Sequence, residues 1–369
     1  MCTTIPLAAN IPVESGSPEI ESPLADRLVG AATGALELFG VYLGSRLGLY
    51  SWLDRAGSST EAAVAAGAGI DERYAREWLE QQAVAGFLAT DANPDPVGRR
   101  YWVDESNRGA LVEETDGEHV APLARMVVGI AGVLDQVATA YRTGDGVPYE
   151  NYGADFRHGQ GSINRPAFEA DLVESWLPAI PDVSETLAAG GSIADVGCGQ
   201  GYSTVAMAKA WPNAEVLGVD VDRASVTDAR SFADGQGVPA RFAELGGEGL
   251  AGLGSFDVIT MLECLHDMAH PGQALRSARE ALNAGGVLVL ADELVADRFA
   301  APGDEMERMM YGWSISHCLP ASRTEAGSAA LGTVLRRSTV EQLAVDAGFS
   351  SVEVVDVDGG FFRIYALRP

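Results

Sequence analysis

Residues 195–202 read Asp195-Val196-Gly197-Cys198-Gly199-Gln200-Gly201-Tyr202, and this stretch decides the fold of the second half of the chain. The apolar run before it predicts a strand at 193–197, and a helix is expected to begin near Ser203. Glycines let the backbone turn sharply and approach a ligand, whose polar groups then meet the N-terminus of the helix. Asp220 ends the next expected strand, where a carboxylate can accept hydrogen bonds from both hydroxyls of a ribose. The sequence therefore predicts a nucleotide-type site.

The residues after 190 alternate short Val, Ile and Leu runs with amphipathic helices, which is typical of a parallel α/β sheet. The turn Asp358-Gly359-Gly360 is so short that the two runs beside it must be antiparallel. The predicted fold class is α/β: a Rossmann-like, mostly parallel sheet with an antiparallel C-terminal hairpin. Its GxGxG spacing and this hairpin are foreign to the usual NAD-binding fold. The expected strands are 193–197, 215–220, 240–244, 256–261, 286–292, 351–357 and 361–367.

The N-terminal part has the pattern of a winged helix. Apolar residues recur at helical spacing over 24–53. The segment Ser59-Thr60-Glu61 and Asp71 stand where helix caps are expected, and a turn-rich stretch before Tyr101 is typical of a hairpin. The predicted organisation is a mobile tail at 1–23, a winged-helix-like dimerisation domain at 24–105, a helical linker with substrate-cavity helices at 106–190, and a catalytic domain at 191–369 with a lid insertion at 300–335.

Composition restricts the partners of this chain. The 369 residues are 47% hydrophobic and carry a net charge of −27, so the protein is expected to be globular and to repel nucleic acid and anionic lipid. The second helix of the winged helix has more acids than bases, against what DNA binding requires. We expect no nucleic acid partner and a homodimer formed through the N-terminal domain. The alternative from another class of protein is a cofactor-binding winged-helix regulator.

The location of the protein is also constrained. The longest apolar stretch, 123–141, is interrupted by Arg125 and Asp135, so no membrane span and no membrane partner are expected. Residues 1–23 lack the basic start and apolar centre of a secretory signal. The four cysteines are far apart, without a CxxC pair, which favours reduced thiols over disulfides or a zinc site. We expect a cytoplasmic protein.

Several of the residues named so far resemble the motifs of a known protein family. Residues 195–202, Asp220, the run at 256–260 and the terminal hairpin resemble the class I S-adenosylmethionine-dependent methyltransferases. The winged helix, the helical linker and Leu265-His266-Asp267-Met268 resemble the two-domain small-molecule type, which includes plant-type O-methyltransferases and actinobacterial relatives. The resemblance implies a site for S-adenosyl-L-methionine, bound through Gly197, Gly199 and Asp220. The neighbouring loop residues Asp195 and Gly201 are expected to belong to the same site.

Two details of the resemblance bear on the site. The family often has an acid after the third strand that reads adenine, but residues 241–248 offer no Asp at the expected place, which leaves the adenine contacts open. In the plant-type enzymes, a His-Asp-Trp segment after the fourth strand supplies the base. His266-Asp267-Met268 matches it except for Met in place of Trp. His266 is therefore the candidate base for O-methylation of a phenol-like acceptor, and its alternative is to buttress the loop.

Glu169 is the second candidate base. On a helical projection it lies near the centre of an apolar face that includes Phe168, Leu172 and Trp176, where a carboxylate is costly unless it is paired or protonated. It could form an ion pair with an arginine across the domain interface. It could also act after C-methylation of an isoprenoid, such as a prenyl diphosphate with Mg²⁺, because an alkene has no hydroxyl proton to lose.

The insertion at 300–335 is rich in methionine and aromatic residues. It lies beyond the carboxyl ends of the strands, where ligands bind in such sheets, although residues of this kind also form cores. The expected walls of a largely apolar substrate cavity are Tyr311, Trp313, His317 and Trp176. His270 follows His266 at HxxxH spacing, but without a nearby third ligand no metal site is expected.

Overall fold

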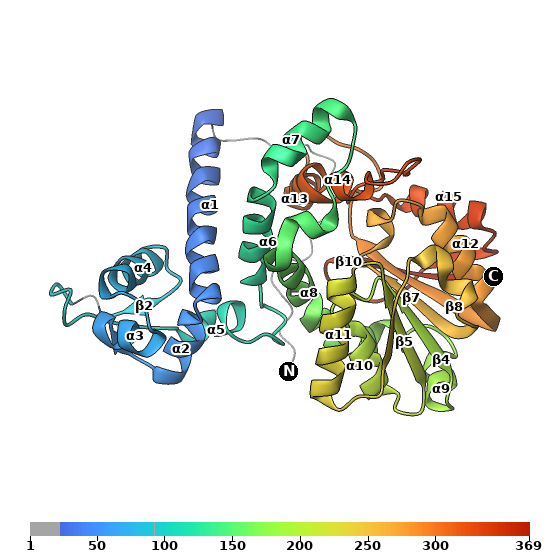
Figure 1. The fold of residues 1–369 in the computed structure, drawn as a ribbon, viewed down its shortest axis with the longest axis horizontal. Coiled ribbons are helices and arrows are strands. Elements are labelled where there is room, and N and C mark those ends of the chain that lie inside the picture. The colour runs from blue at the N-terminus through green and yellow to red at the C-terminus, as the bar shows by residue number, and fades with distance from the viewer. Residues whose placement is uncertain (1–22, 92) are drawn as a thin grey trace. The chain divides into compact units, whose positions relative to one another are not determined.

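A computed structural model of the protein describes residues 23–91 and 93–369 (Figure 1). The described residues divide into two compact units. The first unit comprises 23–91, 93–132 and 154–166, and the second comprises 133–153 and 167–369. The expected tail at 1–23 lies almost entirely outside the described residues.

The first unit contains the winged helix. Thr60 accepts a hydrogen bond from the Ala63 amide (3.4 Å), and Asp71 accepts one from the Arg73 amide (2.9 Å), so both expected caps are confirmed. Three short strands form an antiparallel sheet in the order β1-β3-β2, which confirms the hairpin. The elements are α1 (Leu24–Arg46), α2 (Leu49–Ala56), β1 (Ser59–Thr60), α3 (Glu61–Ala68), α4 (Glu72–Val84), β2 (Ala89–Thr90), β3 (Arg100–Trp102), α5 (Glu105–Leu111) and α6 (Pro122–Ala131).

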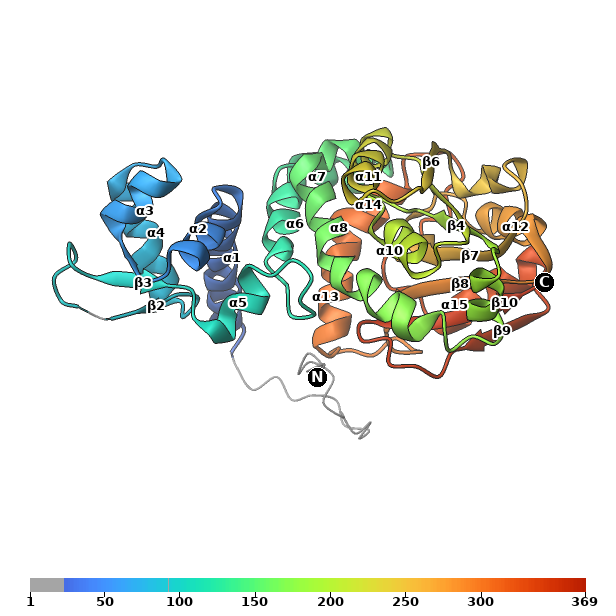
Figure 2. The same ribbon diagram turned by 90° about the horizontal axis from the view of Figure 1, so that it is seen from below.

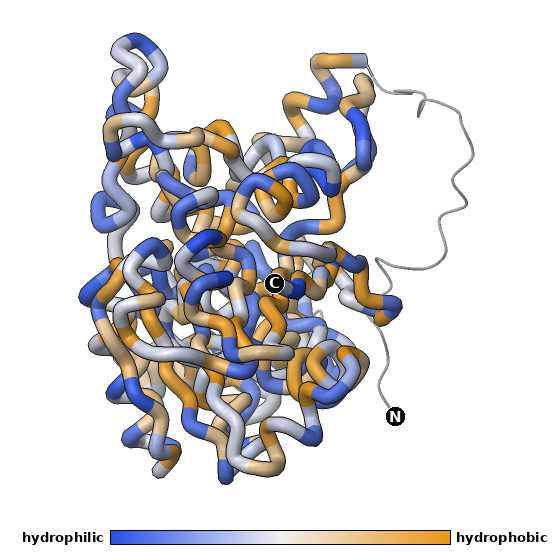
Figure 3. Tube along the Cα trace, turned by 90° about the vertical axis from the view of Figure 1, so that its right-hand side faces the viewer, coloured by the Kyte–Doolittle hydropathy of each residue, from blue (hydrophilic) through white to orange (hydrophobic). Residues whose placement is uncertain are grey.

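Helix α1 exposes much of its apolar surface. In Figure 3 it is the helix that continues from the grey trace, and hydrophobic and hydrophilic stretches alternate along it. Among the described residues, α1 is the single helix long and apolar enough to cross a membrane (mean hydropathy 1.3, 17% buried), and α6 and α7 (Leu134–Thr143) pass the same test as a pair. This is weak evidence for a span, because helices of soluble proteins also pass it. The expectation of no membrane span therefore stays a prediction.

The second unit is built on the predicted sheet, and its fold class is confirmed. The seven strands have the order β6-β5-β4-β7-β8-β10-β9, and β10 is antiparallel to both of its neighbours (Figure 1). The strands are β4 (Ser192–Val196), β5 (Glu215–Asp220), β6 (Arg241–Glu244), β7 (Phe256–Leu262), β8 (Leu282–Glu293), β9 (Ser351–Val354) and β10 (Phe362–Arg368). Strand β8 begins four residues before the expected position, because Leu282 continues directly from a helix into the sheet without an apolar run.

Helices cover both faces of this sheet (Figure 2). On one face, α12 (Pro271–Ala281) and α15 (Arg337–Ala347) bury their apolar sides against the strands. On the other, the π-helix η3 (Leu172–Trp176), α9 (Val183–Ala188) and α10 (Tyr202–Ala210) do the same. The remaining helices are η2 (Tyr149–Tyr152), α8 (Gly153–Glu169), α11 (Arg223–Gln236), η4 (Gly247–Gly252), η5 (Leu265–Asp267), α13 (Glu305–Trp313), the π-helix η6 (Ser314–Cys318) and α14 (Leu319–Ser322). Because β4, β5, β7 and β8 are parallel, their carboxyl ends lie at one edge of the sheet.

Candidate active site

The glycine loop follows β4 as expected. Gly197, Gly199 and Gly201 have φ of 72°, 51° and 80°, the left-handed region that favours glycine. A Cβ on Gly197 would lie 2.6 Å from Cβ of Cys264, so side chains are excluded there. No atom lies within 4 Å of the place where a Cβ on Gly199 would be. The middle of the loop is therefore open to a ligand, while its first glycine is packed against the protein.

Asp220 lies beside this opening. Its Oδ2 accepts a hydrogen bond from the Gly199 amide (2.8 Å), and its Oδ1 accepts one from the Asp222 amide (2.8 Å). Burial raises the pKa of Asp220 to about 6. The structure thus brings together two candidate cofactor residues that the sequence singles out at the ends of different strands. Their contact with a cofactor stays a prediction.

Asp195 is placed differently from the open residues of the loop. It is 1% exposed, and its carboxylate accepts hydrogen bonds from the hydroxyls of Ser203 (2.6 Å), Thr204 (2.6 Å) and Thr260 (2.7 Å). Burial raises its pKa. Asp195 therefore ties β4 to β7 and to the first turn of α10 from behind the loop, and its membership of the cofactor site stays a prediction.

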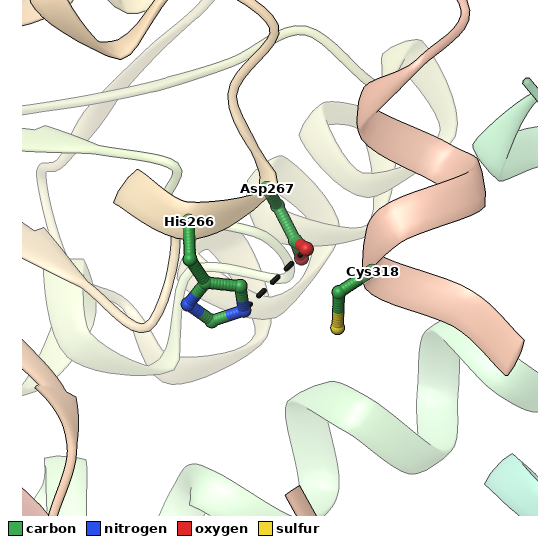
Figure 4. A group of neighbouring side chains, drawn as sticks. All are labelled: His266, Asp267 and Cys318. Carbon is green, nitrogen blue, oxygen red and sulfur yellow. Dashed lines mark ion pairs between the residues drawn. The ribbon is translucent and has the colours of Figure 1, made fainter. Parts of the chain in front are cut away.

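His266 lies after β7, in the short 3₁₀ helix η5. Glu263 has a φ of 52°, a left-handed conformation that turns the chain sharply at the end of the strand. The His266 ring is 2% exposed, and its Nδ1 lies 3.0 Å from Oδ1 of Asp292 and 3.5 Å from Oε2 of Glu293. Because a carboxylate accepts from Nδ1–H, the Nε2 lone pair is the one left for chemistry. Nε2 faces Asp267, whose Oδ1 is 3.4 Å away (Figure 4).

The carboxyl groups around His266 set its charge. Burial opposes protonation of the ring, but Glu293, Asp292 and Asp267 outweigh it and hold the pKa of His266 well above its ordinary value. Burial raises the pKa of Glu293 well above its ordinary range, whereas the His266 ring overcomes burial and lowers the pKa of Asp292. Both members of this acidic pair therefore favour the protonated ring of His266. The pair makes His266 a stronger base than a solvated histidine.

The predicted cavity residues have different surroundings. Trp176 is fully buried in the core, with its ring centroid 5.7 Å from that of Phe362, so it packs on the sheet. Tyr311 is 39% exposed and Trp313 is partly buried. His317 is 1% exposed and packs edge-on against Tyr152 with centroids 4.6 Å apart. Burial lowers the pKa of His317 to about 4, so this ring is neutral. The cavity role of these four residues stays a prediction.

Glu169 is the last residue of α8 and is half-buried. The expected apolar face is real in part, because Leu172, Trp176 and Ile180 are in the core. However, η3 is a π-helix, so the turn after Glu169 does not keep the 3.6-residue period on which the projection depends. Its role as a base stays a prediction.

Three residues of the site were missed in the sequence. Asp292 and Glu293 stand at the carboxyl end of the buried strand β8, and two acids at such a strand end are the signal that could have revealed them. Cys318 comes from η6, and its thiol lies within 4.8 Å of the ligand atoms of His266 and Asp267 (Figure 4). Nothing in the spacing of Cys318 predicts this contact. His270, at HxxxH spacing from His266, belongs to none of the possible metal-binding groups among the described residues and instead lies 3.4 Å from Glu325.

Comparison with known families identifies both domain types. Residues 194–288 match the family model described as a methyltransferase domain, and residues 34–105 match the Rv2258c-like winged HTH domain. The chain therefore joins a winged-helix domain to a class I methyltransferase domain, as the sequence predicts. Two curated relatives are ubiquinone biosynthesis O-methyltransferases of Ralstonia nicotianae and Nitrosococcus oceani, 35% and 36% identical over 100 residues, 27% of this chain. The matched part spans only 41% and 42% of those relatives.

Solved structures share the fold of nearly the whole chain. Human N-acetylserotonin methyltransferase in complex with SAM has a TM-score of 0.70 at 18% identity, covering 95% of this chain and 99% of that one. The mitomycin 7-O-methyltransferase MmcR has a TM-score of 0.67 at 18% identity, covering 93% and 97%. PigF with SAH has a TM-score of 0.68 at 18% identity, covering 94% and 100%. The whole described chain thus has the two-domain fold of these methyltransferases.

Proposed function

We propose that this protein transfers a methyl group from S-adenosylmethionine to an oxygen of a small, largely apolar specialised metabolite. The observation that carries the proposal is the buried contact between His266 and Asp292 at the end of β7, on the same sheet edge as the glycine loop. One fold neighbour named above is titled an O-methyltransferase, and the curated relatives matched over 100 residues bear that name too. Transfer of a labelled methyl group to hydroxylated aromatic acceptors tests the proposal.

The loop and Asp220 form the proposed cofactor site. The open space at Gly199 admits the cofactor beside the backbone of the loop. The Asp220 carboxylate accepts a hydrogen bond from the loop amide at 2.8 Å, and its oxygens can also accept hydrogen bonds from ribose hydroxyls. Bound there, S-adenosylmethionine supplies an electrophilic methyl group on a sulfonium. Asp195 keeps the loop and α10 in place through its three hydroxyl donors.

His266 is the base that accepts the proton of the acceptor hydroxyl. Methyl transfer to a hydroxyl is an in-line displacement, so the protein must align the acceptor and remove its proton. The Nδ1–H donates to Asp292, which fixes the ring orientation and leaves Nε2 to accept the acceptor's proton. The negative charge on Asp292 then stabilises the imidazolium that forms. No metal ion is needed for this step.

The carboxyl groups around His266 predict a pH profile for the reaction. The rate constant kcat/KM should rise with pH through the raised pKa of His266 and then level off, because Nε2 must be unprotonated. Asp292→Asn and Glu293→Gln each remove a carboxyl group that raises this pKa, so in both variants the rise should move to lower pH by about one pH unit. The plateau should also fall in Asp292→Asn, which loses the charge that stabilises the imidazolium. A pH profile that stays in place in both variants would contradict this role of the carboxyl groups.

Two alternatives have less support. C-methylation of a prenyl diphosphate would need Glu169 as the base and Mg²⁺ on the diphosphate, but Glu169 lies outside the His266 cluster. A DNA-binding regulator would need free basic groups on α4. Instead, Arg73 pairs with Glu77 and Arg76 pairs with Glu61, so both arginines of α4 are neutralised within the domain. We therefore favour the enzyme.

We also propose that the protein forms a homodimer through α1. The exposed apolar side chains of this helix fall within an arc of about 140° at the helical period. They are Leu24, Leu28, Val29, Leu36, Phe39 and Leu43, together with Leu47 directly after the helix, all 39–67% exposed. A continuous apolar stripe of this kind on a soluble protein marks an interaction surface, and a second copy of the same helix matches it by symmetry.

The double variant Leu28→Glu with Leu36→Glu should convert the dimer to a monomer. Two carboxylates in the centre of a paired apolar stripe would be buried without partners, which is strongly unfavourable. Light scattering after size-exclusion chromatography measures the mass directly. Val84→Glu is the matched control, because Val84 is a 90% exposed apolar residue of α4 away from this stripe. A wild-type chain that elutes as a monomer would remove the proposed dimer.

A further inference from the structure

A mixed cluster of metal-ligating side chains stands beside the proposed base. His266 Nε2, an Asp267 carboxylate oxygen and Cys318 Sγ all lie within 4.8 Å of one another (Figure 4). His266 and Cys318 are 2% and 5% exposed, and Asp267 is partly buried. The imidazole and carboxylate come from η5, whereas the thiol comes from η6, fifty residues later in the chain. The fold has therefore brought together three different donor types at one point.

We propose that His266, Asp267 and Cys318 bind a thiophilic divalent cation of the Zn²⁺ type. Nitrogen, carboxylate oxygen and thiolate sulfur are the donors that zinc uses in proteins, and a set of three leaves a fourth tetrahedral position open. Mg²⁺ prefers an all-oxygen set with several waters, so a site with a thiolate and an imidazole selects against it.

The spacing of the His266 and Asp267 donors fits such an ion. Zinc bonds to nitrogen and oxygen of about 2.0–2.2 Å at a tetrahedral angle put the two donor atoms roughly 3.3–3.5 Å apart. The distance from His266 Nε2 to Asp267 Oδ1 is 3.4 Å. That Asp267 oxygen is buried and accepts no hydrogen bond from a described residue. This oxygen faces Nε2, with which it forms an ion pair when the ring is protonated, and a metal ion bound here would take the place of that proton.

The outer contacts of the cluster give independent support. A histidine that binds zinc almost always donates its other ring N–H to a carboxylate or a carbonyl, which fixes the tautomer and the ring orientation. Nδ1 of His266 does this with Asp292 at 3.0 Å. Cys318 is also in contact with the neighbouring ring, with its Sγ 3.4 Å from Nδ1 of His317. The ring of His266 is thus held with Nε2 toward Asp267 and Cys318.

The ion would act as an inhibitor. The lone pair of Nε2 can bind either a metal ion or the proton of the acceptor, but not both. Zn²⁺ bound here would remove the base from methyl transfer, a consequence that rests on the proposed function of His266. The binding of the metal does not depend on that function, so the two can be tested separately.

Cobalt substitution tests the coordination without any assay of activity. Purified protein is stripped with a chelator and titrated with Co²⁺, whose bond to a thiolate gives a charge-transfer band in the near ultraviolet. We expect one equivalent of Co²⁺ per chain, displacement by Zn²⁺, and no competition from Mg²⁺. Cys318→Ser should abolish the band, and Asp267→Asn should weaken binding at least 10-fold. Cys198→Ser, which removes a buried thiol of the glycine loop, should keep the band.

The outcomes are distinct. Absence of a stoichiometric band in the wild type, or a band that persists in Cys318→Ser, would overturn the proposed site. Thermal melts of each variant show that it is folded. If the metal binds but methyl transfer continues unchanged in the Zn²⁺-loaded protein, the site is retained and the inhibitory role is overturned. If metal-free protein shows no transfer to any acceptor, the proposed function fails while the site stands.

Discussion

His266→Asn should lower kcat for methyl transfer to a hydroxyl acceptor by about 10²-fold or more, with the affinity for S-adenosylmethionine unchanged. The asparagine side chain can still donate to Asp292 but cannot accept the acceptor's proton at pH 7. The loss therefore falls on the chemical step, because the glycine loop and Asp220 are separate from the base. Steady-state kinetics gives kcat, and calorimetry of cofactor binding gives the affinity.

Two further variants make this result specific. His119→Asn also removes a histidine that is 7% exposed, but it lies in the first unit, so its turnover should stay near that of the wild type. Glu169→Gln should have a mild effect, because Glu169 is not part of the His266 cluster. Full activity of His266→Asn, or loss of activity confined to Glu169→Gln, would contradict the assignment of the base and favour carbon methylation.

Gly199→Val should abolish measurable binding of S-adenosylmethionine. The position of a Cβ at Gly199 is free of protein atoms within 4 Å, so the added side chain would occupy space that the cofactor needs. A branched side chain at a φ of 51° also strains the backbone. Gly237→Val is the matched control, since Gly237 has a φ of 66°, no atom within 4 Å of its Cβ position, and a place at the end of α11. Gly237→Val therefore introduces the same backbone strain but leaves the glycine loop at 197–201 unblocked.

Asp220→Ala completes the test of the cofactor site. Loss of a charged acceptor for two ribose hydroxyls should weaken the affinity by about 10- to 150-fold, equivalent to roughly 1.5–3 kcal/mol. Because Asp220 also accepts from the Gly199 amide, a thermal melt must show that the loop domain remains folded. Calorimetry with unchanged cofactor affinity in both Gly199→Val and Asp220→Ala would place the cofactor elsewhere.

The sequence predicted most of the fold because its signals are local. Alternating apolar runs located all seven strands of the large sheet within a few residues, apart from the start of β8. The caps at Thr60 and Asp71 located helix starts, since a cap depends on neighbours within three residues. The π-helices η3 and η6 were not predictable, because an extra residue in one turn leaves no mark in a pattern of period 3.6.

The site was predictable only in part, because the sequence shows local signals and not the contacts between distant segments. Gly199 and Asp220 were paired correctly, because the carboxyl ends of adjacent parallel strands meet. Asp195 lies behind the loop, where its carboxylate accepts hydrogen bonds from the hydroxyls of Ser203, Thr204 and Thr260. Thr260 comes from another strand, so this contact could not be read from the local sequence. The contact of Cys318 with His266 arises from tertiary packing of η6. A candidate base could be read from one segment, whereas its surroundings could not.

Product analysis with S-adenosylmethionine carrying an isotopic label on its methyl group tests the central claim most directly. The protein is incubated with a panel of hydroxylated aromatic compounds and, separately, with prenyl diphosphates in the presence and absence of Mg²⁺. Mass spectrometry detects labelled products, and NMR identifies the methylated atom. We predict a label on oxygen of a hydroxylated aromatic acceptor, without a requirement for Mg²⁺, and its loss in His266→Asn. A label on carbon of a prenyl diphosphate, lost in Glu169→Gln and retained in His266→Asn, would contradict the account.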